Sequence, residues 1–186
     1  MSSSSSRNNK RINLFSFALL AALALTSCST PAPKFEKPTK PGLSLVFGHI
    51  DMKDAPTGIR WVDMRRVRPV AEKDVYYFWV VDGTFLRSHV PEGTYKLTQF
   101  GGGKYTYSFP AQGKGDLDRQ ITKPGVYYVG SYKYKKIPRG LFRDDQFDLI
   151  PTDSPSELEL LKKISVYSRD DYWKDMIEKR IRELEK

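Results

Sequence analysis

Cysteine and histidine are nearly absent from this chain, whose 186 residues include one Cys and two His. A single cysteine cannot form an intrachain disulfide, and it leaves no cysteine-based metal site. The folded part must therefore be stabilised by its hydrophobic core alone. The apolar stretch Leu14–Leu25 is about a dozen residues long, whereas a permanent bilayer-spanning helix needs roughly 20 residues, so it is not expected to be one.

The composition is that of an ordinary globular protein, with 39% hydrophobic and 28% charged residues. Disorder along the whole chain is therefore not expected. Aromatic residues reach 13% and fall in short alternating runs, which favours β-structure. The length suggests one domain with accessory segments.

The N-terminal segment has the three-part layout of a signal peptide. A positive region with Arg7, Lys10 and Arg11 precedes the apolar Leu14–Leu25, and small residues lead on to Cys28. This layout predicts export and removal of the segment. Loss of its three basic residues leaves 28 basic against 22 acidic residues, a net charge of +6. Such an excess suits an ordinary soluble surface, or attraction to anionic lipids and wall polymers.

The stretch Leu25-Thr26-Ser27-Cys28 resembles the lipobox of bacterial lipoproteins. In that family the signal is cut just before the cysteine, whose sulfur carries a diacylglycerol group. The resemblance implies a signal peptide over residues 1–27 and lipidation of Cys28. Because Ser29 rather than Asp follows, it also implies an outer-membrane location in a two-membrane envelope. Two or three acyl chains, at ~0.8 kcal/mol per buried CH₂ group, suffice for stable anchoring.

Residues 28–42 are expected to form a tether between this lipid anchor and a folded domain. Four prolines within residues 29–41 exclude a helix and favour extended polyproline II structure. At ~3.1 Å per residue, such a segment reaches about 40 Å. The domain is therefore expected to sit clear of the lipid head groups.

Residues 43–150 contain short runs of β-branched and aromatic residues between turn signals, and each run predicts a strand. The expected strands are Leu43–Ile50, Ile59–Arg65, Val75–Val81, Thr84–Val90, Thr94–Phe100, Lys104–Phe109, Val126–Tyr134 and Phe147–Ile150. Their number and spacing predict a mainly β fold, an antiparallel β-sandwich or barrel. Val75–Val81 is the most apolar run, and we expect a central strand with Trp79 buried.

Two stretches resemble the prealbumin-like sandwiches, a group that includes carboxypeptidase regulatory-like and Cna B-type domains. In Pro91-Glu92-Gly93-Thr94-Tyr95-Lys96-Leu97 a Pro-x-Gly-x-Tyr-x-Leu pattern enters a strand, and Asp82-Gly83-Thr84-Phe85 precedes it as a turn and strand. The resemblance implies an antiparallel sandwich that serves as a spacer or a binding module. A fold by itself does not decide between such functions.

Residues 151–186 change to a helical period and predict two C-terminal helices. Ser154 and Glu157 are spaced as a capping box for the first helix, and the second is expected to start near Ser168. Its apolar stripe is expected to pack on the sandwich, although a partner chain could also cover it. The stripe consists of Trp173, Met176, Ile177, Ile181 and Leu184.

No group of residues predicts a catalytic centre, a metal site or a cofactor. His49 and Asp51 share one strand face, but two ligands do not make a metal site. The acidic region of Asp144, Asp145, Asp148 and Asp153 matches no calcium loop and is interpreted as a solvated loop. Gly101–Lys104 lacks the Ser or Thr of a phosphate-binding loop and predicts a hairpin loop.

The segment Tyr132–Lys136 interleaves aromatic and basic residues. Candidate contacts to an anionic glycan or lipid are Lys133, Lys135, Lys136, Arg65 and Arg66. The alternative is that the tyrosines point inward and the lysines outward, since neighbours on a strand face opposite sides. We expect a non-enzymatic envelope module with a structural or protein-interaction role, and no nucleic-acid partner. The alternative function is binding of lipopolysaccharide or a wall polymer through a basic aromatic face.

Overall fold

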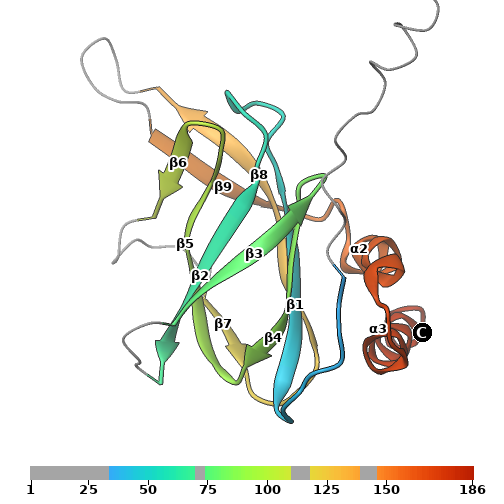
Figure 1. Ribbon diagram of the computed structural model, residues 1–186. Helices are drawn as coiled ribbons and strands as arrows, with labels where there is room; N and C mark the ends of the chain where they lie inside the picture. Colours follow the sequence, from blue (N-terminus) through green and yellow to red (C-terminus); the bar gives the residue numbers. More distant parts are fainter. Residues whose placement is uncertain (1–33, 70–73, 110–117, 139–145) are drawn as a thin grey trace, which may run out of the picture. The chain divides into compact units, whose positions relative to one another are not determined.

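The computed structural model describes residues 34–69, 74–109, 118–138 and 146–186, so the expected signal peptide and Cys28 lie outside the described residues. Within those ranges the chain forms nine strands, two α-helices and a short 3₁₀ turn (Figure 1). The strands are β1 Leu43–Asp51, β2 Trp61–Arg68, β3 Val75–Val81, β4 Thr84–Pro91, β5 Gly93–Gly102, β6 Tyr105–Ser108, β7 Asp118–Ile121, β8 Val126–Ile137 and β9 Gln146–Thr152. The helices are α2 Glu157–Ile164 and α3 Asp171–Leu184, with the 3₁₀ turn Ser165–Tyr167 between them.

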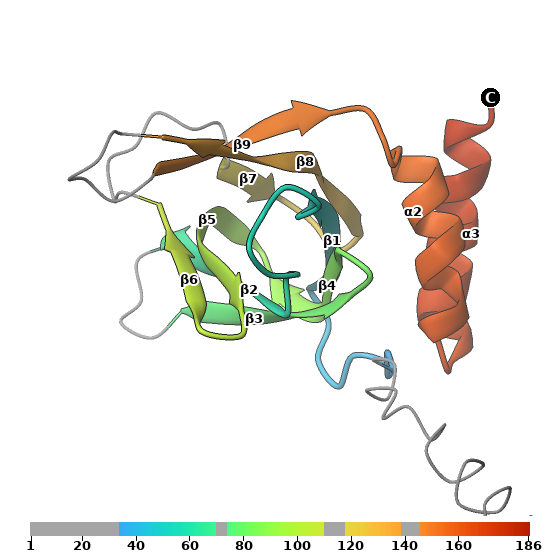
Figure 2. The same ribbon diagram turned by 90° about the horizontal axis from the view of Figure 1, so that it is seen from above.

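All nine strands belong to one mixed sheet with the order β6-β5-β2-β3-β4-β1-β8-β9, and β7 pairs with β5. The pairing of β1 with β8 is parallel, and the other pairs are antiparallel. Figure 2 shows the sheet rolled nearly into a barrel. The mainly β fold is confirmed, whereas the expected antiparallel sandwich is not. Hydrophobic periodicity indicates which side of each strand is buried, and it leaves the choice of neighbouring strands open.

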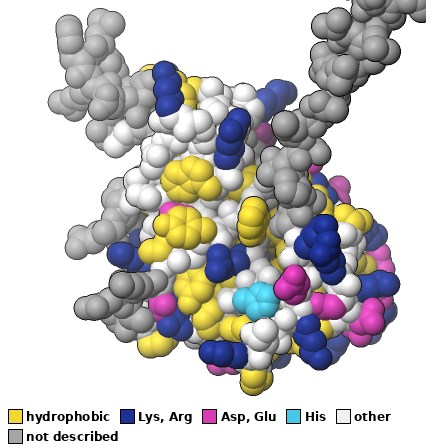
Figure 3. Space-filling view, in the orientation of Figure 1, with side chains coloured by type: hydrophobic (Ala, Val, Ile, Leu, Met, Phe, Trp, Pro, Cys, Tyr) yellow, Lys and Arg dark blue, Asp and Glu magenta, His cyan; other side chains and the backbone are white. Residues whose placement is uncertain are grey.

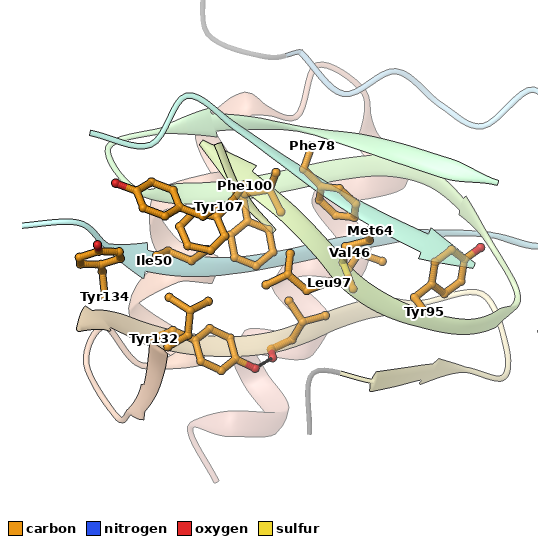
Figure 4. Close-up of a cluster of buried hydrophobic side chains, with 14 of the residues drawn as sticks. Val46, Ile50, Met64, Phe78, Tyr95, Leu97, Phe100, Tyr107, Tyr132 and Tyr134 are labelled. Atoms are coloured by element: carbon orange, nitrogen blue, oxygen red, sulfur yellow. Dashed lines mark hydrogen bonds between the residues drawn. The ribbon is translucent and has the colours of Figure 1, made fainter. Parts of the chain in front are cut away.

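The interior of the rolled sheet holds the larger of two hydrophobic cores. Inward side chains alternate along each strand, as the period of two requires, and Figure 4 shows a part of this core. The two ends of the sheet meet through side chains. Phe147 of β9 lies 5.2 Å from Tyr107 of β6 between ring centroids. Arg119 Nε of β7 donates to Val129 O of β8 at 3.1 Å. These contacts close the wall where no ladder joins the edges.

The two helices cover the outer face of the sheet at β1 and β4 and form a second core with it. Trp173 and Ile177 of α3 are fully buried there, packed with Leu45, Phe47 and Leu86 among others. The expectation that the apolar stripe of the last helix packs on its own domain is confirmed.

Both helices begin two residues later than the sequence suggested. The N-cap of α2 is Ser156, whose hydroxyl accepts from the Glu159 N–H, while the Glu159 carboxylate accepts from the Ser156 N–H. The prediction of a capping box at Ser154 is therefore wrong. The sequence holds two overlapping Ser-x-x-Glu patterns, and the second one, from Ser156 to Glu159, forms the box. Asp170 caps α3 by accepting from the Trp173 N–H, in place of the expected start near Ser168.

Part of the expected tether is fixed to this body. Phe35 is buried in the second core, and its backbone N–H donates to Tyr167 O at 3.1 Å. Trp173 Nε1 donates to Glu36 O at 2.9 Å. An aromatic side chain within the proline-rich segment thus finds apolar cover beside α3. The expected tether is therefore fixed to the folded body at Phe35 and Glu36.

Candidate functional site

The two faces of β3 differ sharply in exposure. Phe78 points into the core and is 3% exposed, whereas Tyr77 and Trp79 are 64% and 60% exposed. β3 is a central strand of the sheet, as expected, but the expectation that Trp79 is buried is wrong. The helices cover the outer face near Leu86 of β4, and they leave the outer face of β3 uncovered. Figure 3 shows hydrophobic side chains gathered over the strands that lie in front in Figure 1.

Strands β3 and β4 separate beside these aromatic residues. Their ladder covers Val81↔Thr84 to Trp79↔Leu86 and ends there. Arg87 occupies the gap that follows, and its Nη1 donates to the Tyr77 carbonyl oxygen at 2.6 Å. The guanidinium carbon also lies 5.4 Å from the centroid of the Tyr76 ring. Arg87 thus provides a hydrogen bond to the Tyr77 carbonyl, at a position where β3 has no ladder partner in β4.

A β-bulge in β4 follows Arg87. The register with β1 moves from Val46↔Arg87 to Ser44↔Val90, so two residues, Ser88 and His89, stand opposite Leu45. His89 has a φ of 66°, in the left-handed region, and the Ser88 hydroxyl lies 2.9 Å from its Nδ1. Bulges redirect side chains in this way and are common beside functional sites.

These features surround a small cavity of about 190 Å³. It is lined by Lys34, Phe35, Trp79, Arg87, Ser88 and His89. None of these six residues is acidic. The Nε of Arg87 is buried and has no acceptor among the described residues. The cavity therefore combines positive charge with an exposed indole ring. This arrangement suits an anionic group attached to an apolar or amphipathic molecule.

An almost buried carboxylate lies on the same side of the sheet. Asp63 of β2 pairs with Tyr77 of β3, is 7% exposed, and its Oδ1 has no partner among the described residues. Burial raises the pKa of Asp63. Because it is covered, this carboxylate is not presented to a ligand as an open charge.

The two histidines lie at different positions on neighbouring strands, and His49 of β1 is paired with Thr84 of β4. His49 lies on β1, and burial, followed by the positive charge of Lys163, lowers its pKa, while Asp51 acts in the opposite direction. His89 lies on β4 beside the cavity. Among the residues that the structure describes, no group of three or more His, Cys, Asp and Glu side chains could hold a metal ion.

The ligand contacts predicted from sequence are spread over two distant strands. Lys133 of β8 pairs with Asp54 at 2.9 Å, and Arg66 Nε of β2 donates to Asp74 at 2.6 Å. Three strands, β3, β4 and β1, separate β2 from β8 in the sheet. The other predicted contacts, Arg65 on β2 and Lys135 and Lys136 on β8, are exposed.

The tyrosines beside these lysines, Tyr132 and Tyr134, are buried. The interpretation with aromatic residues inward and lysines outward is confirmed. An external ligand therefore has no aromatic ring to stack on between these lysines.

The prediction of a hairpin loop at Gly101–Lys104 is confirmed, since the segment lies at the β5–β6 hairpin with Gly103 at a φ of 58°. The interpretation of the acidic region as a loop is wrong for Asp148, which lies on β9 and pairs with Lys135 of β8. Its carboxylate accepts from the Leu149 N–H, and Asp144 and Asp145 lie outside the described residues.

A second, larger hollow of about 580 Å³ lies between the start of β8 and α3. Its charged groups are largely paired with one another, since Arg180 bonds to Glu157 at 2.7 Å and to Glu183 at 3.4 Å. The cavity beside Trp79 is therefore the stronger candidate for recognition of a charged ligand.

Sequence reasoning missed this site, although one signal for it was present. Tyr77 and Trp79 alternate with Phe78 and Val80, so one pair had to face away from the core. The cluster of Lys34, Arg87 and His89 had no sequence signal, because the residues come from separate segments.

Comparison of the chain with protein-family models, with curated proteins and with solved structures found no match. In the described part of the chain, no helix is both long and apolar enough to cross a membrane.

Proposed function

We propose that this chain is an exported bacterial lipoprotein whose folded body acts in the cell envelope by binding rather than by catalysis. The signal peptide, residues 1–27, is removed, and Cys28 carries the lipid anchor. The lipobox-like segment after an apolar stretch supports this proposal. Ser29 after the cysteine supports an outer-membrane location.

The observation that carries the binding role is the cationic cavity beside Trp79. The anchor and this cavity lie close together along the chain, since Lys34 follows Cys28 by six residues. Of the two functions expected from sequence, this favours the binder of an anionic glycan or lipid. The structural or protein-interaction role stays as the second candidate. It is favoured by the exposed Tyr77 and Trp79, since aromatic residues are enriched at protein interfaces.

A prealbumin-like relationship remains part of the proposal. It rests on the Pro91–Leu97 stretch, whose Tyr95 and Leu97 are buried in β5 as that pattern implies. A solved relative of this chain with the strand order of the prealbumin-like sandwiches would support the relationship. A relative with a different strand order would contradict it.

The anchor is tested by labelling expressing bacteria with radioactive palmitate. The wild-type chain is expected to take up label and to fractionate with membranes. Cys28→Ser is expected to take up none and to remain soluble or unprocessed. Ser29→Ala, changed at the neighbouring residue, serves as the control and is expected to keep the label. Label that persists in Cys28→Ser contradicts the assignment.

A further inference from the structure

The polar groups around the cavity are arranged to meet an anion. Arg87 uses Nη1 on the Tyr77 carbonyl, and this bond fixes the guanidinium while its buried Nε is left without an acceptor. Lys34 lines the same cavity and is exposed. Guanidinium and ammonium groups are the donors that phosphate and carboxylate oxygens accept most readily. No acidic side chain lines the cavity, so its positive charge suits an anionic group of a ligand.

The surroundings of the cavity suit a membrane surface better than a small soluble anion. Trp79 lines the cavity, and Tyr77 lies two residues before it on the same exposed face. Tryptophan and tyrosine prefer the level of the lipid head groups, where the ring is in a partly apolar medium and its polar atom stays hydrated. A lipid would place a phosphate beside the cations and its glycerol and upper acyl carbons beside the rings.

The length of the chain before the folded body gives a geometric limit. Lys34 follows Cys28 by six positions, and a fully extended chain spans at most ~3.6 Å per residue, so the chain allows at most about 22 Å between the two Cα atoms. Phe35 is docked beside α3, so the residues that follow it add no length to the chain between Cys28 and the cavity. If Cys28 is acylated, the cavity is therefore held within reach of the membrane that carries the anchor.

From these observations we propose that the cavity of Lys34, Arg87, Ser88 and His89 binds the phosphate of an anionic phospholipid head group. Tyr77 and Trp79 then lie in the membrane interface, and the outer face of β3 is turned toward the lipid. The orientation rests on the proposed anchor at Cys28, whereas the head-group site itself does not. The head group adds a specific, salt-sensitive contact to the non-specific hold of the acyl chains.

The test uses the chain from residue 28 with Cys28→Ser, which carries no acyl chain. Both hydrophobic cores are formed by residues from Phe35 onward, so this chain keeps all of their contacts. Its binding to vesicles is measured by flotation, with phosphatidylcholine alone and with added phosphatidylglycerol, at low and at high salt. We expect binding only to the anionic vesicles, and weaker binding at high salt.

Two variants assign this binding to the cavity. One cation near an anionic surface contributes about 1 kcal/mol, so Arg87→Gln and Lys34→Gln are each expected to weaken binding about fivefold. Lys135→Gln removes an exposed lysine on β8 outside the cavity and is expected to change nothing. Lys34 is exposed, so Lys34→Gln remains informative if Arg87→Gln is unstable.

Three outcomes would overturn the proposal. The first is equal binding to neutral vesicles, and the second is binding unchanged by both Arg87→Gln and Lys34→Gln. The third is Arg87-dependent binding of soluble dextran sulfate with no binding to anionic vesicles, which would assign the cavity to a glycan. Absence of palmitate label from the wild-type chain, or label that persists in Cys28→Ser, would remove the orientation and leave the vesicle result standing.

Discussion

At the scale of single residues, neighbours on β3 have opposite roles. Phe78 is 3% exposed and Trp79 is 60% exposed. Truncating a buried aromatic residue to alanine typically costs about 3–5 kcal/mol, so Phe78→Ala should unfold readily. Trp79→Ala should keep a thermal midpoint close to that of the wild type, and thermal unfolding of both variants checks the pair. A large loss of stability in Trp79→Ala would mean that the outer face of β3 is covered.

Asp63 makes a prediction about pH. Its pKa is raised in the folded state by burial, so the folded protein holds the proton more tightly than the unfolded chain. The stabilisation is fully present below the unfolded pKa near 4 and is lost as the pH rises through the folded pKa. As the pH rises above ~4, the wild type should therefore lose stability relative to Asp63→Asn, as measured by urea unfolding. A stability difference that does not change with pH would contradict this.

For single residues, the sequence predicted which side chains face the core where charged neighbours gave a signal, and it failed where they did not. It placed Tyr132 and Tyr134 inward correctly, because the lysines between them allowed one choice of face. It placed Trp79 wrongly, because an apolar run with no charged residue gives no signal for which side faces solvent. The role of Arg87 depends on the end of the β3–β4 ladder, which a single residue cannot reveal.

At the scale of elements, α3 should be required for stability. Deleting the residues after Tyr167 removes Trp173 and Ile177 from the second core and exposes Phe47 and Leu86. Each Å² of apolar surface returned to water costs about 25 cal/mol, so the thermal midpoint should fall clearly. Deleting only Glu185 and Lys186, which are exposed, is the matched control and should have no effect. A midpoint unchanged by the longer deletion, with loss of a cross-linked partner, would make α3 an interaction arm.

The existence of most elements followed from sequence, and their partners did not. All eight expected strands are present, because alternation and turn residues are local signals. The short, polar β7 had no such signal, and the parallel pairing of β1 with β8 is a long-range choice. The start of α2 moved because Ser154 and Ser156 both head a Ser-x-x-Glu pattern.

At the scale of the whole protein, the proposed anchor and the proposed head-group site describe one arrangement. A lipid at Cys28 would hold the body near the membrane, and the site beside Trp79 would decide which face is turned toward it. The net charge of +6 for the chain after residue 27 is consistent with an anionic surface as the neighbour.

The orientation is tested most directly by tryptophan fluorescence of the acylated chain in anionic vesicles whose lipids carry bromine near the glycerol. Trp61 lies opposite Trp79 in the β2–β3 ladder and is partly exposed, so every chain compared carries Trp61→Phe. Trp173 is buried beneath the helices, so it should be little affected, whereas Trp79 should be quenched at short range. The account predicts strong quenching in the chain that keeps Trp79, and loss of most of it when Trp79→Phe is added. Quenching that is absent in the acylated chain with Trp79, or that persists unchanged after Trp79→Phe, would contradict it.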